Sequence, residues 1–555
     1  MITRWIAALL IAASGVAMAD ADSAARFKGT GKPDPVRITN VAVKPSGEAG
    51  AADVTFDLAW DWSWRAAWKV KPEQHGGKDT LKLENWDAAW VFVKFRKPGA
   101  DGWKHAILST DKAAHKAPTG AKLDLGSSDD PADGGAGGKR GIGAFVYRAS
   151  NGHGANNWKG VSLRWLHGKN GLKDPKAVEI KVLAVEMVRV PQCAFWLGDG
   201  TSKDVVGTFS RGTGVKPFRI TSEQAIGLGG EDAQNLGNRD SDGMFANTPD
   251  DFNRDQSRRL PASFPKGYAG FYCMKYEVTQ QQYVDYLNLL SYRDQCRAMA
   301  LNSRHNKGNM FGGRAKSKAG TPLDRKAQGN TIMIEVPGVT PPSTPLVVDR
   351  KTFVASASIE HPGTPARFKT SSPHVACNGN SQPQVAAYCA WAGLRPMTEL
   401  EYEKTCRGPI LPVANEYAWG TTEIDWDRYH HKGKAGVPWR VGAFTTPESD
   451  RGQAGASYWG ILDLSGNVLE TTVGVGLVVG RRFNGTHGEG GNAPWETKDT
   501  FGYRGGAFPG HHYEHSGGDL ALRVADRFIA CRANVIEAGV ERWYPLGFRC
   551  VRTEP

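Results

Sequence analysis

The residues best suited to chemistry lie near the C-terminal end, where positions 503–515 read Y-R-G-G-A-F-P-G-H-H-Y-E-H. Imidazole and carboxylate groups bind Zn²⁺, Cu²⁺ and non-heme iron, so His511, His512, Glu514 and His515 are candidate metal ligands. Adjacent side chains of an extended chain point in opposite directions, so at most two of the three imidazoles would converge. The alternative, a polar loop rim without a metal, is the one we favour.

The N-terminal residues have the pattern of an export signal. Arg4 supplies a positive charge, an apolar run covers residues 5–16, and a small-x-small cleavage signal ends at Ala19. We therefore expect removal of residues 1–19 and a secreted or periplasmic location. The apolar run is short for a bilayer and no later segment is a better candidate, so we expect no membrane span.

The net charge of the chain is +12, which by itself could indicate an anionic partner such as nucleic acid, a membrane surface or a polysaccharide. Lysine and arginine are spread along the chain rather than clustered. Because exported proteins rarely meet nucleic acid, we expect no nucleic-acid partner.

Residues 37–185 predict an all-β sandwich, preceded by a flexible arm at 20–36. The alternation of apolar and polar residues from position 53 onward has the period of a half-buried strand. The residues expected on the apolar face are Val54, Phe56, Leu58, Trp60, Trp62 and Trp64, and those expected on the other face are Asp53, Thr55, Asp57, Asp61 and Ser63. Further strands are expected at 89–95, 142–148, 161–166 and 178–188. The connections are rich in Gly, Pro, Asn and Asp, and no helical period interrupts the strands, which favours antiparallel sheets.

Nine tryptophans lie between Trp60 and Trp165. They could form a platform on which sugar rings stack, and Trp68, Trp86 and Trp103 near turns suit that role best. The alternative is a core position, which we favour because alternation is first a sign of burial.

From residue 186 the pattern changes to short strands and helices. Thr279 is an expected helix N-cap, and Thr398 is another, with Glu401 completing a capping box. A helix is also expected at 384–393. Residues 297–383 read as a long insertion rich in Lys, Ser, Pro and Thr, in which 331–336 and 346–354 are candidates for a hairpin.

Seven motifs in this part resemble the formylglycine-generating enzyme family, also called the sulfatase-modifying-factor domain. They occur in the family's order at 188–198, 276–283, 388–407, 417–420, 460–470, 504–508 and 547–552. The resemblance implies an α+β C-type-lectin-like fold over residues 186–555, with little regular secondary structure.

The chain has eight cysteines and no C-x-x-C motif, and an even number in an exported protein favours disulfides over metal binding. The resemblance implies the pairs Cys389–Cys550 and Cys406–Cys531. The other four cysteines have no counterpart and stay unassigned: Cys193, Cys273, Cys296 and Cys377.

The resemblance also implies a calcium site at the D-L-x-G-N-x-x-E turn. Asp463 and Glu470 would supply carboxylates, and Gly466 and Val468 would supply carbonyl oxygens, which are the hard ligands that Ca²⁺ prefers. The alternative is a turn held by Asp and Asn capping alone.

The family's oxidase reaction, as the resemblance implies it, uses two cysteine thiolates that hold copper, because thiolates are soft ligands and good nucleophiles. Here the first expected cysteine falls on Gly510, and the second falls on His515 or Asp526, depending on the direction of counting. We therefore expect neither a copper or iron cofactor nor formylglycine generation.

The favoured hypothesis is an exported, non-catalytic binding or assembly protein whose C-terminal loops contact a glycan or protein partner. The expected binding-loop residues are Trp495, Arg504, Phe508, His511, His512 and Glu514. The alternative is an oxygen-dependent copper or iron enzyme, with His511 and His515 as candidate catalytic residues. An active formylglycine generator that uses cysteines from elsewhere in the chain is the least supported hypothesis.

Overall fold

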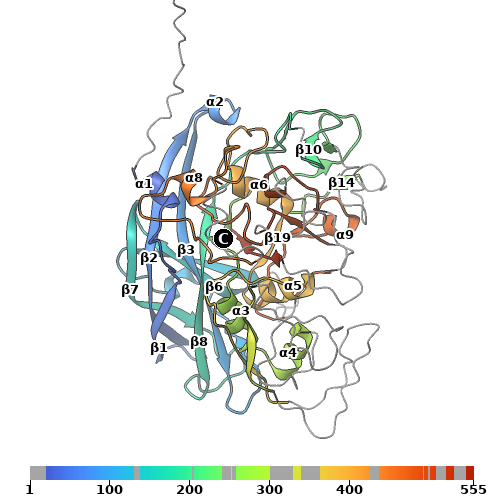
Figure 1. Cartoon of the computed structure of the whole chain (residues 1–555). Helices are drawn as coiled ribbons and strands as arrows, with labels where there is room; N and C mark the ends of the chain where they lie inside the picture. Colours follow the sequence, from blue (N-terminus) through green and yellow to red (C-terminus); the bar gives the residue numbers. More distant parts are fainter. Residues whose placement is uncertain are drawn as a thin grey trace, which may run out of the picture.

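The structure is a computed structural model of the chain, shown in Figure 1. It describes residues 21–130, 138–202, 205–239, 252, 258–299, 329–338, 363–425, 437–491, 493–497, 500–507, 521–530 and 545–555. The predicted signal peptide, residues 1–19, lies outside these ranges.

Long strands dominate the N-terminal part and form one side of the molecule in Figure 1. The strands are β1 (Arg37–Pro45), β2 (Ala52–Val70), β3 (Leu81–Arg96), β4 (Lys104–His105), β5 (Ala121–Asp129), β6 (Lys139–Arg148), β7 (Gly152–Trp165) and β8 (Glu179–Val190). Short helical turns accompany them: α1 (Ala21–Ala24), η1 (Ala25–Phe27), α2 (Pro72–His75) and η2 (Lys112–Ala114).

The alternation predicted for β2 is confirmed as far as Trp60 and is wrong just beyond it, since Trp62 is only partly buried and Ser63 is 0% exposed. Val54, Phe56, Leu58 and Trp60 are at most 1% exposed, and the residues between them are partly exposed. The β2–β7 pairing then shifts register between Trp60 and Ser63. This irregularity changes which residues face inward, because side chains alternate strictly only along a regular strand.

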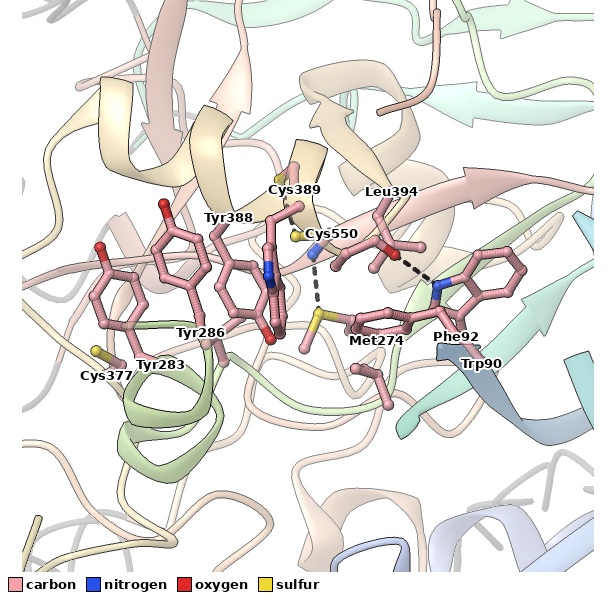
Figure 2. Packing of buried hydrophobic residues seen from close by; sticks show 14 of the residues in the cluster. Trp90, Phe92, Met274, Tyr283, Tyr286, Cys377, Tyr388, Cys389, Leu394 and Cys550 are labelled. Carbon is pink, nitrogen blue, oxygen red and sulfur yellow. Dashed lines mark hydrogen bonds between the residues drawn. The ribbon is translucent and has the colours of Figure 1, made fainter. Parts of the chain in front are cut away.

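Strand β3 is buried on both faces. Ala89, Val91, Val93 and Phe95 pack with the inner face of β2 and β7, whereas Trp90 and Phe92 pack against helices of the C-terminal part. Trp90 Nε1 donates to Ala392 O at 2.8 Å, a contact visible in Figure 2. The near-continuous burial of β3 is what a strand with both faces covered requires.

The tryptophans expected in the core are there, since Trp60, Trp64, Trp90 and Trp165 are 0% exposed. The candidates for a sugar platform have their ring faces covered by guanidinium groups. The distances from Cζ to the ring centroid are 4.3 Å for Arg26 over Trp68, 4.4 Å for Arg65 and for Arg189 over Trp86, and 5.0 Å for Arg96 over Trp103. Stacking of a sugar on these faces would displace the arginines.

The C-terminal part has shorter strands, on the opposite side of Figure 1. They are β9 (Phe195–Leu197), β10 (Thr208–Arg211), β11 (Phe218–Ile220), β12 (Ile226–Gly227), β13 (Leu236–Arg239), β14 (Arg259–Leu260), β15 (Phe271–Met274), β16 (Met333–Val336), β17 (Arg367–Lys369), β18 (Arg395–Thr398), β19 (Leu469–Val473), β20 (Phe501–Arg504), β21 (Leu546–Gly547) and β22 (Cys550–Thr553). The helices are α3 (Gln280–Leu287), α4 (Tyr292–Met299), α5 (Gln382–Trp391), α6 (Glu399–Arg407), α8 (Arg451–Ala454) and α9 (Val478–Arg481). None of the helices within the described ranges is both long and apolar enough to span a membrane.

The two parts share one sheet. Strand β8 pairs antiparallel with β3 over Glu179–Val188, and its last residues, Met187–Val190, pair with β15. The sheet then continues through β22, β18, β19 and β20. The boundary that we placed between residues 185 and 186 therefore falls inside β8, and the strand's hydrogen bonds tie both parts together.

The arm expected to be flexible at 20–36 is docked in part, at residues 23–30, whereas residues 31–33 and 35 are exposed. Arg26 is 7% exposed, and its guanidinium lies over the rings of Phe27 and Trp68 with both Cζ–centroid distances at 4.3 Å. Its Nε donates to Tyr458 O at 2.9 Å. Composition alone suggested a loose arm, but these contacts with residues far along the chain hold its first part against the fold.

The predicted helix caps are confirmed. Gln282 N donates to Thr279 Oγ1 at 3.2 Å, and Glu401 N donates to Thr398 Oγ1 at the same distance. Thr398 N donates to Glu401 Oε2 at 3.0 Å, which completes the capping box. The helix predicted at 384–393 begins slightly earlier, as α5.

The described part of the insertion contains a strand pair that differs from our expectation. Strand β16 pairs antiparallel with β17 at Arg367–Lys369. The strand proposed as its partner, 346–354, lies outside the described residues. The sequence between them is long, so turn chemistry could not fix the pairing.

Aromatic residues of α3 and α5 meet in the core that Figure 2 shows. Tyr286 packs edge-on against Tyr388 with ring centroids 5.5 Å apart, and Tyr388 packs edge-on against Phe548 at 5.3 Å. The core joins the C-terminal helices to β3 and β22, and thereby fixes the frame that carries the candidate site.

Candidate functional site

The base of the 503–515 segment is firmly anchored. Strand β20 is buried and ends at Arg504, where Gly505 and Gly506 take φ angles of +85° and +67°. A Cβ on Gly505 would lie 2.6 Å from Leu464 O, so only glycine fits this close approach. Gly505 O also accepts a hydrogen bond from Gly466 N at 2.7 Å, which joins this segment to the predicted calcium turn.

Arg504 lies inside the protein. It is 1% exposed, its Nη2 donates to Glu403 Oε1 at 2.7 Å, and its Nη1 donates to Glu399 Oε2 at 3.2 Å. Nη2 also donates to Val524 O at 2.6 Å. We expected Arg504 in a ligand-binding loop, but its guanidinium is committed to these internal partners and holds the base of the loop.

The remaining candidates in this segment lie outside the described residues. These are Phe508, His511, His512, Glu514 and His515. Trp495 is described and half-buried: its indole packs near Phe483 with centroids 6.2 Å apart, and Nε1 donates to Thr486 O at 3.0 Å. Trp495 therefore keeps part of its ring at the surface in a fixed orientation.

Asp526 takes one of the positions where the resemblance places a cysteine. It is 3% exposed, with Oδ1 accepting from Phe528 N at 3.0 Å and Oδ2 accepting from Val206 N at 3.3 Å. Burial raises the pKa of this carboxyl to about 6, against the favourable hydrogen bonds and the nearby Arg504 and Arg527. With these contacts the Asp526 side chain holds its loop in place.

All cysteines with described side chains are buried: Cys193, Cys273, Cys377, Cys389, Cys406 and Cys550. Burial raises the pKa of the Cys406 thiol to about 12, and it also raises the pKa of Cys193, Cys273 and Cys550. A thiol in such surroundings stays protonated at neutral pH, which removes its nucleophilicity and its affinity for metals.

The structure brings Cys389 and Cys550 together, with Sγ atoms 2.9 Å apart (Figure 2). They are free thiols here, and the disulfide that the resemblance implies stays a prediction. Cys531, the expected partner of Cys406, lies outside the described residues.

The predicted calcium turn has a strained backbone that suits its residue types. Asp463 and Asn467 adopt left-handed φ angles of +63° and +60°, which Asp and Asn tolerate better than most residues. Asp463 Oδ2 accepts from Gly442 N at 2.6 Å. Asn467 Oδ1 accepts from Trp439 N at 2.9 Å, so capping holds part of the turn.

The carboxylates around the turn outnumber the cations. Glu470 Oε1 accepts from Arg549 Nε at 2.6 Å, whereas its Oε2 is buried without a hydrogen-bond partner. Glu277 accepts from Asn467 Nδ2 at 2.5 Å and from Val468 N at 3.0 Å. Burial raises the pKa of Glu277 well above its usual value, and Asp463 and Glu470 raise it further by repulsion.

From the sequence we did not assign Glu277 or Arg549 to this turn. Two signals were visible: Glu277 lies beside the helix cap Thr279, and Arg549 belongs to the closing motif at 547–552. Burial also raises the pKa of Asp463 and of Glu470, with Arg549 opposing the rise at Glu470. The orphaned Glu470 Oε2 and the hard-oxygen donor set fit a Ca²⁺ ion. Within the described ranges, no cluster of three or more His, Cys, Asp or Glu side chains is arranged to hold a metal, so carbonyl oxygens would have to complete the site.

Comparison with known proteins extends this picture. A family model described as the sulfatase-modifying factor enzyme 1-like domain (FGE-sulfatase) matches residues 241–554, more than half of the chain. The chain belongs to the FGE-sulfatase family. The match covers the anchored loop base, the buried cysteines other than Cys193, and the turn at Asp463.

Two curated proteins share a shorter similarity, and both are named hercynine oxygenase. The protein from Mycolicibacterium smegmatis is 34% identical over 90 residues, which is 16% of this chain and 19% of the relative. The protein from Mycobacterium tuberculosis is 38% identical over 91 residues, with the same shares. This FGE-sulfatase chain thus spans about a fifth of the length of these curated relatives, and the family includes oxidoreductases.

Proposed function

We propose that this FGE-sulfatase chain is an exported, non-catalytic binding or assembly protein whose C-terminal loops contact a glycan or protein partner. The observation that carries the proposal is the state of the cysteines. The oxidase chemistry implied by the resemblance needs accessible thiolates, and every cysteine with a described side chain is buried. A scaffold that keeps its frame while the described cysteines are buried is suited to binding.

The arrangement of the loop base supports the same proposal. Arg504, at the base of the loop, is held by hydrogen bonds to Glu399 and Glu403. The half-buried Trp495 exposes part of its indole ring at the surface of the 481–495 segment. A rigid aromatic ring on an ordered loop contributes contact area at small entropic cost. Such a surface fits a sugar ring or a peptide side chain.

The proposal includes Ca²⁺ at the turn of Asp463, Gly466, Val468 and Glu470. The support is the excess of buried carboxylate over guanidinium and the unsatisfied Glu470 Oε2. Bound there, the ion would neutralise the carboxylates and stiffen the turn that is bonded to Gly505, without taking part in a reaction.

One measurement on the purified full chain tests the non-catalytic role. A peptide with a C-x-P-x-R motif is incubated with the protein under air and copper, and its mass is measured. We expect the cysteine to remain unchanged. Conversion of that cysteine to formylglycine, lost on removal of copper, would disprove the proposal.

Binding is tested on a glycan array with the wild type, Trp495→Ala and Trp495→Phe. We expect Trp495→Ala to lose most of the signal and Trp495→Phe to retain much of it, because phenylalanine keeps an aromatic face. Equal signals from all three proteins would remove this surface from the proposal.

The alternative, an oxygen-dependent copper or iron enzyme, is favoured by the similarity to proteins named hercynine oxygenase. His511 and His515 would be its metal ligands. Stoichiometric copper or iron in the purified protein, lost in His511→Ala and His515→Ala, would establish this alternative. Sub-stoichiometric metal that is insensitive to both substitutions would reject it.

A further inference from the structure

A cavity of about 310 Å³ lies beside the calcium turn, among loops with little regular structure. Three chain segments line it, at 419–425, 439–455 and 463–467. A volume at the low end of the usual range for ligand pockets suits a small molecule. The proposed function assigns Ca²⁺ to Asp463 at one edge of this cavity, which we call the 419–467 pocket, but no ligand to the rest of it.

Aromatic rings form part of its wall. Trp419 stacks on Tyr417 with centroids 4.7 Å apart, and Trp439 packs edge-on against Phe444 at 5.8 Å. Trp419 Nε1 donates to Glu423 O at 2.8 Å, which fixes the indole. The ring faces are therefore held in place before any ligand arrives.

The charged groups that line the 419–467 pocket are all acidic: Glu423, Asp425, Asp450 and Asp463. No lysine, arginine or histidine that the structure describes lines it, although the chain as a whole carries a net charge of +12. Glu423 and Asp450 are exposed, whereas Asp463 is 7% exposed. The pocket thus has accessible carboxylates and one buried carboxylate, and its charge is opposite to that of the protein.

The described arginines nearby form no ion pair with Glu423, Asp450 or Asp463, although the charges of Arg549 and Arg440 lower the pKa of Asp463 against the effect of its burial. Arg451 Nη2 donates to Ala418 O at 2.9 Å and to Cys406 O at 3.3 Å. Arg440 Nη2 donates to the carbonyls of Ala443 and Gly31 at 3.3 and 3.4 Å. Among the described residues, no ion pair joins Glu423, Asp450 or Asp463 to a basic side chain. One oxygen of Asp463, Oδ2, accepts from Gly442 N, and Oδ1 has no hydrogen-bond partner there.

Aromatic faces and carboxylates together select a particular kind of cation. The negative face of an indole or phenyl ring attracts a weakly hydrated cation, and ring faces replace the hydration shell of an alkylated ammonium group well. A Ca²⁺ ion needs six to eight oxygen ligands, which the ring faces of Trp419, Trp439 and Phe444 cannot supply. Anions such as phosphate are repelled by the exposed carboxylates of Glu423 and Asp450.

We propose that the 419–467 pocket binds a small organic cation, with an alkylated ammonium group against Trp419, Trp439 and Phe444 and its charge balanced by Glu423 and Asp450. This site is independent of the proposed glycan or protein contact. It adds a small-molecule ligand to the FGE-sulfatase scaffold and does not require the scaffold to be catalytic.

The test is calorimetric titration of the full chain with choline and with 3,3-dimethylbutan-1-ol, which has the same shape without the charge. We expect choline to bind at least about tenfold more tightly, equivalent to about 1.4 kcal/mol. Tryptophan fluorescence should change on addition of choline, because indole rings line the pocket. Equal binding of both compounds, or no saturable binding of choline, would overturn the proposal.

Substitutions of pocket residues test whether choline binds in this pocket. Glu423→Gln removes one exposed carboxylate and should weaken choline binding at least about threefold, whereas Trp439→Leu should abolish it. Glu448→Gln, an exposed carboxylate outside the pocket, is the matched control and should bind like the wild type. Because Trp439 is only 4% exposed, its variant could fail to fold, and the exposed Glu423 then carries the test. Unchanged affinity in Glu423→Gln would count against the proposal.

A further experiment with calcium distinguishes binding of an organic cation from binding of a metal ion. Choline titrations are repeated with saturating CaCl₂, and Ca²⁺ binding is measured in Glu423→Gln. We expect Glu423→Gln to keep its Ca²⁺ affinity. Loss of both ligands in this variant would show that the carboxylates form a metal site and would refute the organic-cation proposal.

Discussion

Arg527 and Glu399 form a bidentate ion pair with both side chains fully buried. Arg527 Nε donates to Glu399 Oε2 at 2.8 Å, and Nη2 donates to Oε1 at 3.0 Å. Glu399 Oε2 also accepts from Arg504 Nη1 at 3.2 Å, and Glu399 Oε1 accepts from Val475 N at 2.6 Å. One carboxylate at the start of α6 therefore holds two arginines, one of which lies at the base of the candidate loop.

Glu399→Gln should destabilise the protein by about 3–5 kcal/mol, because it leaves two buried guanidinium groups with too little negative charge. Urea unfolding followed by tryptophan fluorescence measures the loss. Glu448→Gln changes an exposed carboxylate and should shift the free energy of unfolding by less than about 0.5 kcal/mol. A loss below about 1 kcal/mol in Glu399→Gln would mean that water or rearrangement compensates the charge.

Asp526 should make the protein less stable as pH rises from about 4 to about 6. Its pKa is raised from 3.8 to about 6 in the folded state, so the folded chain binds more protons than the unfolded chain in this window. The stabilisation is complete below the unfolded pKa and is lost as pH passes the folded pKa. The size is on the order of 3 kcal/mol. Urea unfolding at several pH values should show the slope in the wild type.

Asp526→Asn should flatten that part of the pH profile, because the amide does not titrate. Asp174→Asn, at an exposed position, should leave the profile unchanged. If the slope persists in Asp526→Asn, other buried carboxyls such as Glu277 and Glu470 account for it.

Peptide mapping without reduction should find Cys389 linked to Cys550 and Cys406 linked to Cys531 in protein isolated from an oxidising compartment. The first pair needs only a small movement, since its sulfur atoms are 2.9 Å apart. Each bond closes a long loop, and reduction should cost on the order of 4 kcal/mol of stability. Free thiols at Cys389 and Cys550 after such isolation would contradict the pairing, and with it the export proposal would lose support.

Calcium should raise the thermal unfolding midpoint of the wild type, and EDTA should reverse the effect. At a concentration about 100 times the dissociation constant, a ligand that binds only the folded state stabilises it by about 2.7 kcal/mol. Asp463→Asn should lose the response, because asparagine keeps the left-handed turn but lacks the charge. Asp450→Asn should keep the response, and an unchanged midpoint in the wild type would remove calcium from the proposal.

A chain that begins at residue 191 should not fold by itself. It lacks β3 and β8, and it would expose the edge of β15 and the apolar core that Trp90 and Phe92 complete. We expect aggregation or non-cooperative unfolding, measured by size-exclusion chromatography and circular dichroism. The chain from residue 20 is the control, and cooperative unfolding of the shorter chain would show that the C-terminal part is an independent domain.

The sequence by itself determined the local structure and the family. The caps at Thr279 and Thr398 depend on groups three residues away, and the alternation of Val54 to Trp60 depends on the strand period, so both were readable from neighbouring residues. The ordered motifs indicated the sulfatase-modifying-factor domain, and the family match at 241–554 confirms that assignment.

Only the tertiary structure decided which of these residues face a ligand and which are internal. From the sequence Arg504 is expected to be a binding-loop residue. In the structure Glu399 and Glu403, about a hundred positions away, enclose its side chain. Glu277 meets Asn467 across 190 positions, and β8 joins two parts that composition separates. Burial and charge balance are set by such distant partners, which local patterns do not encode, and the acidic aromatic pocket at 419–467 arises for the same reason.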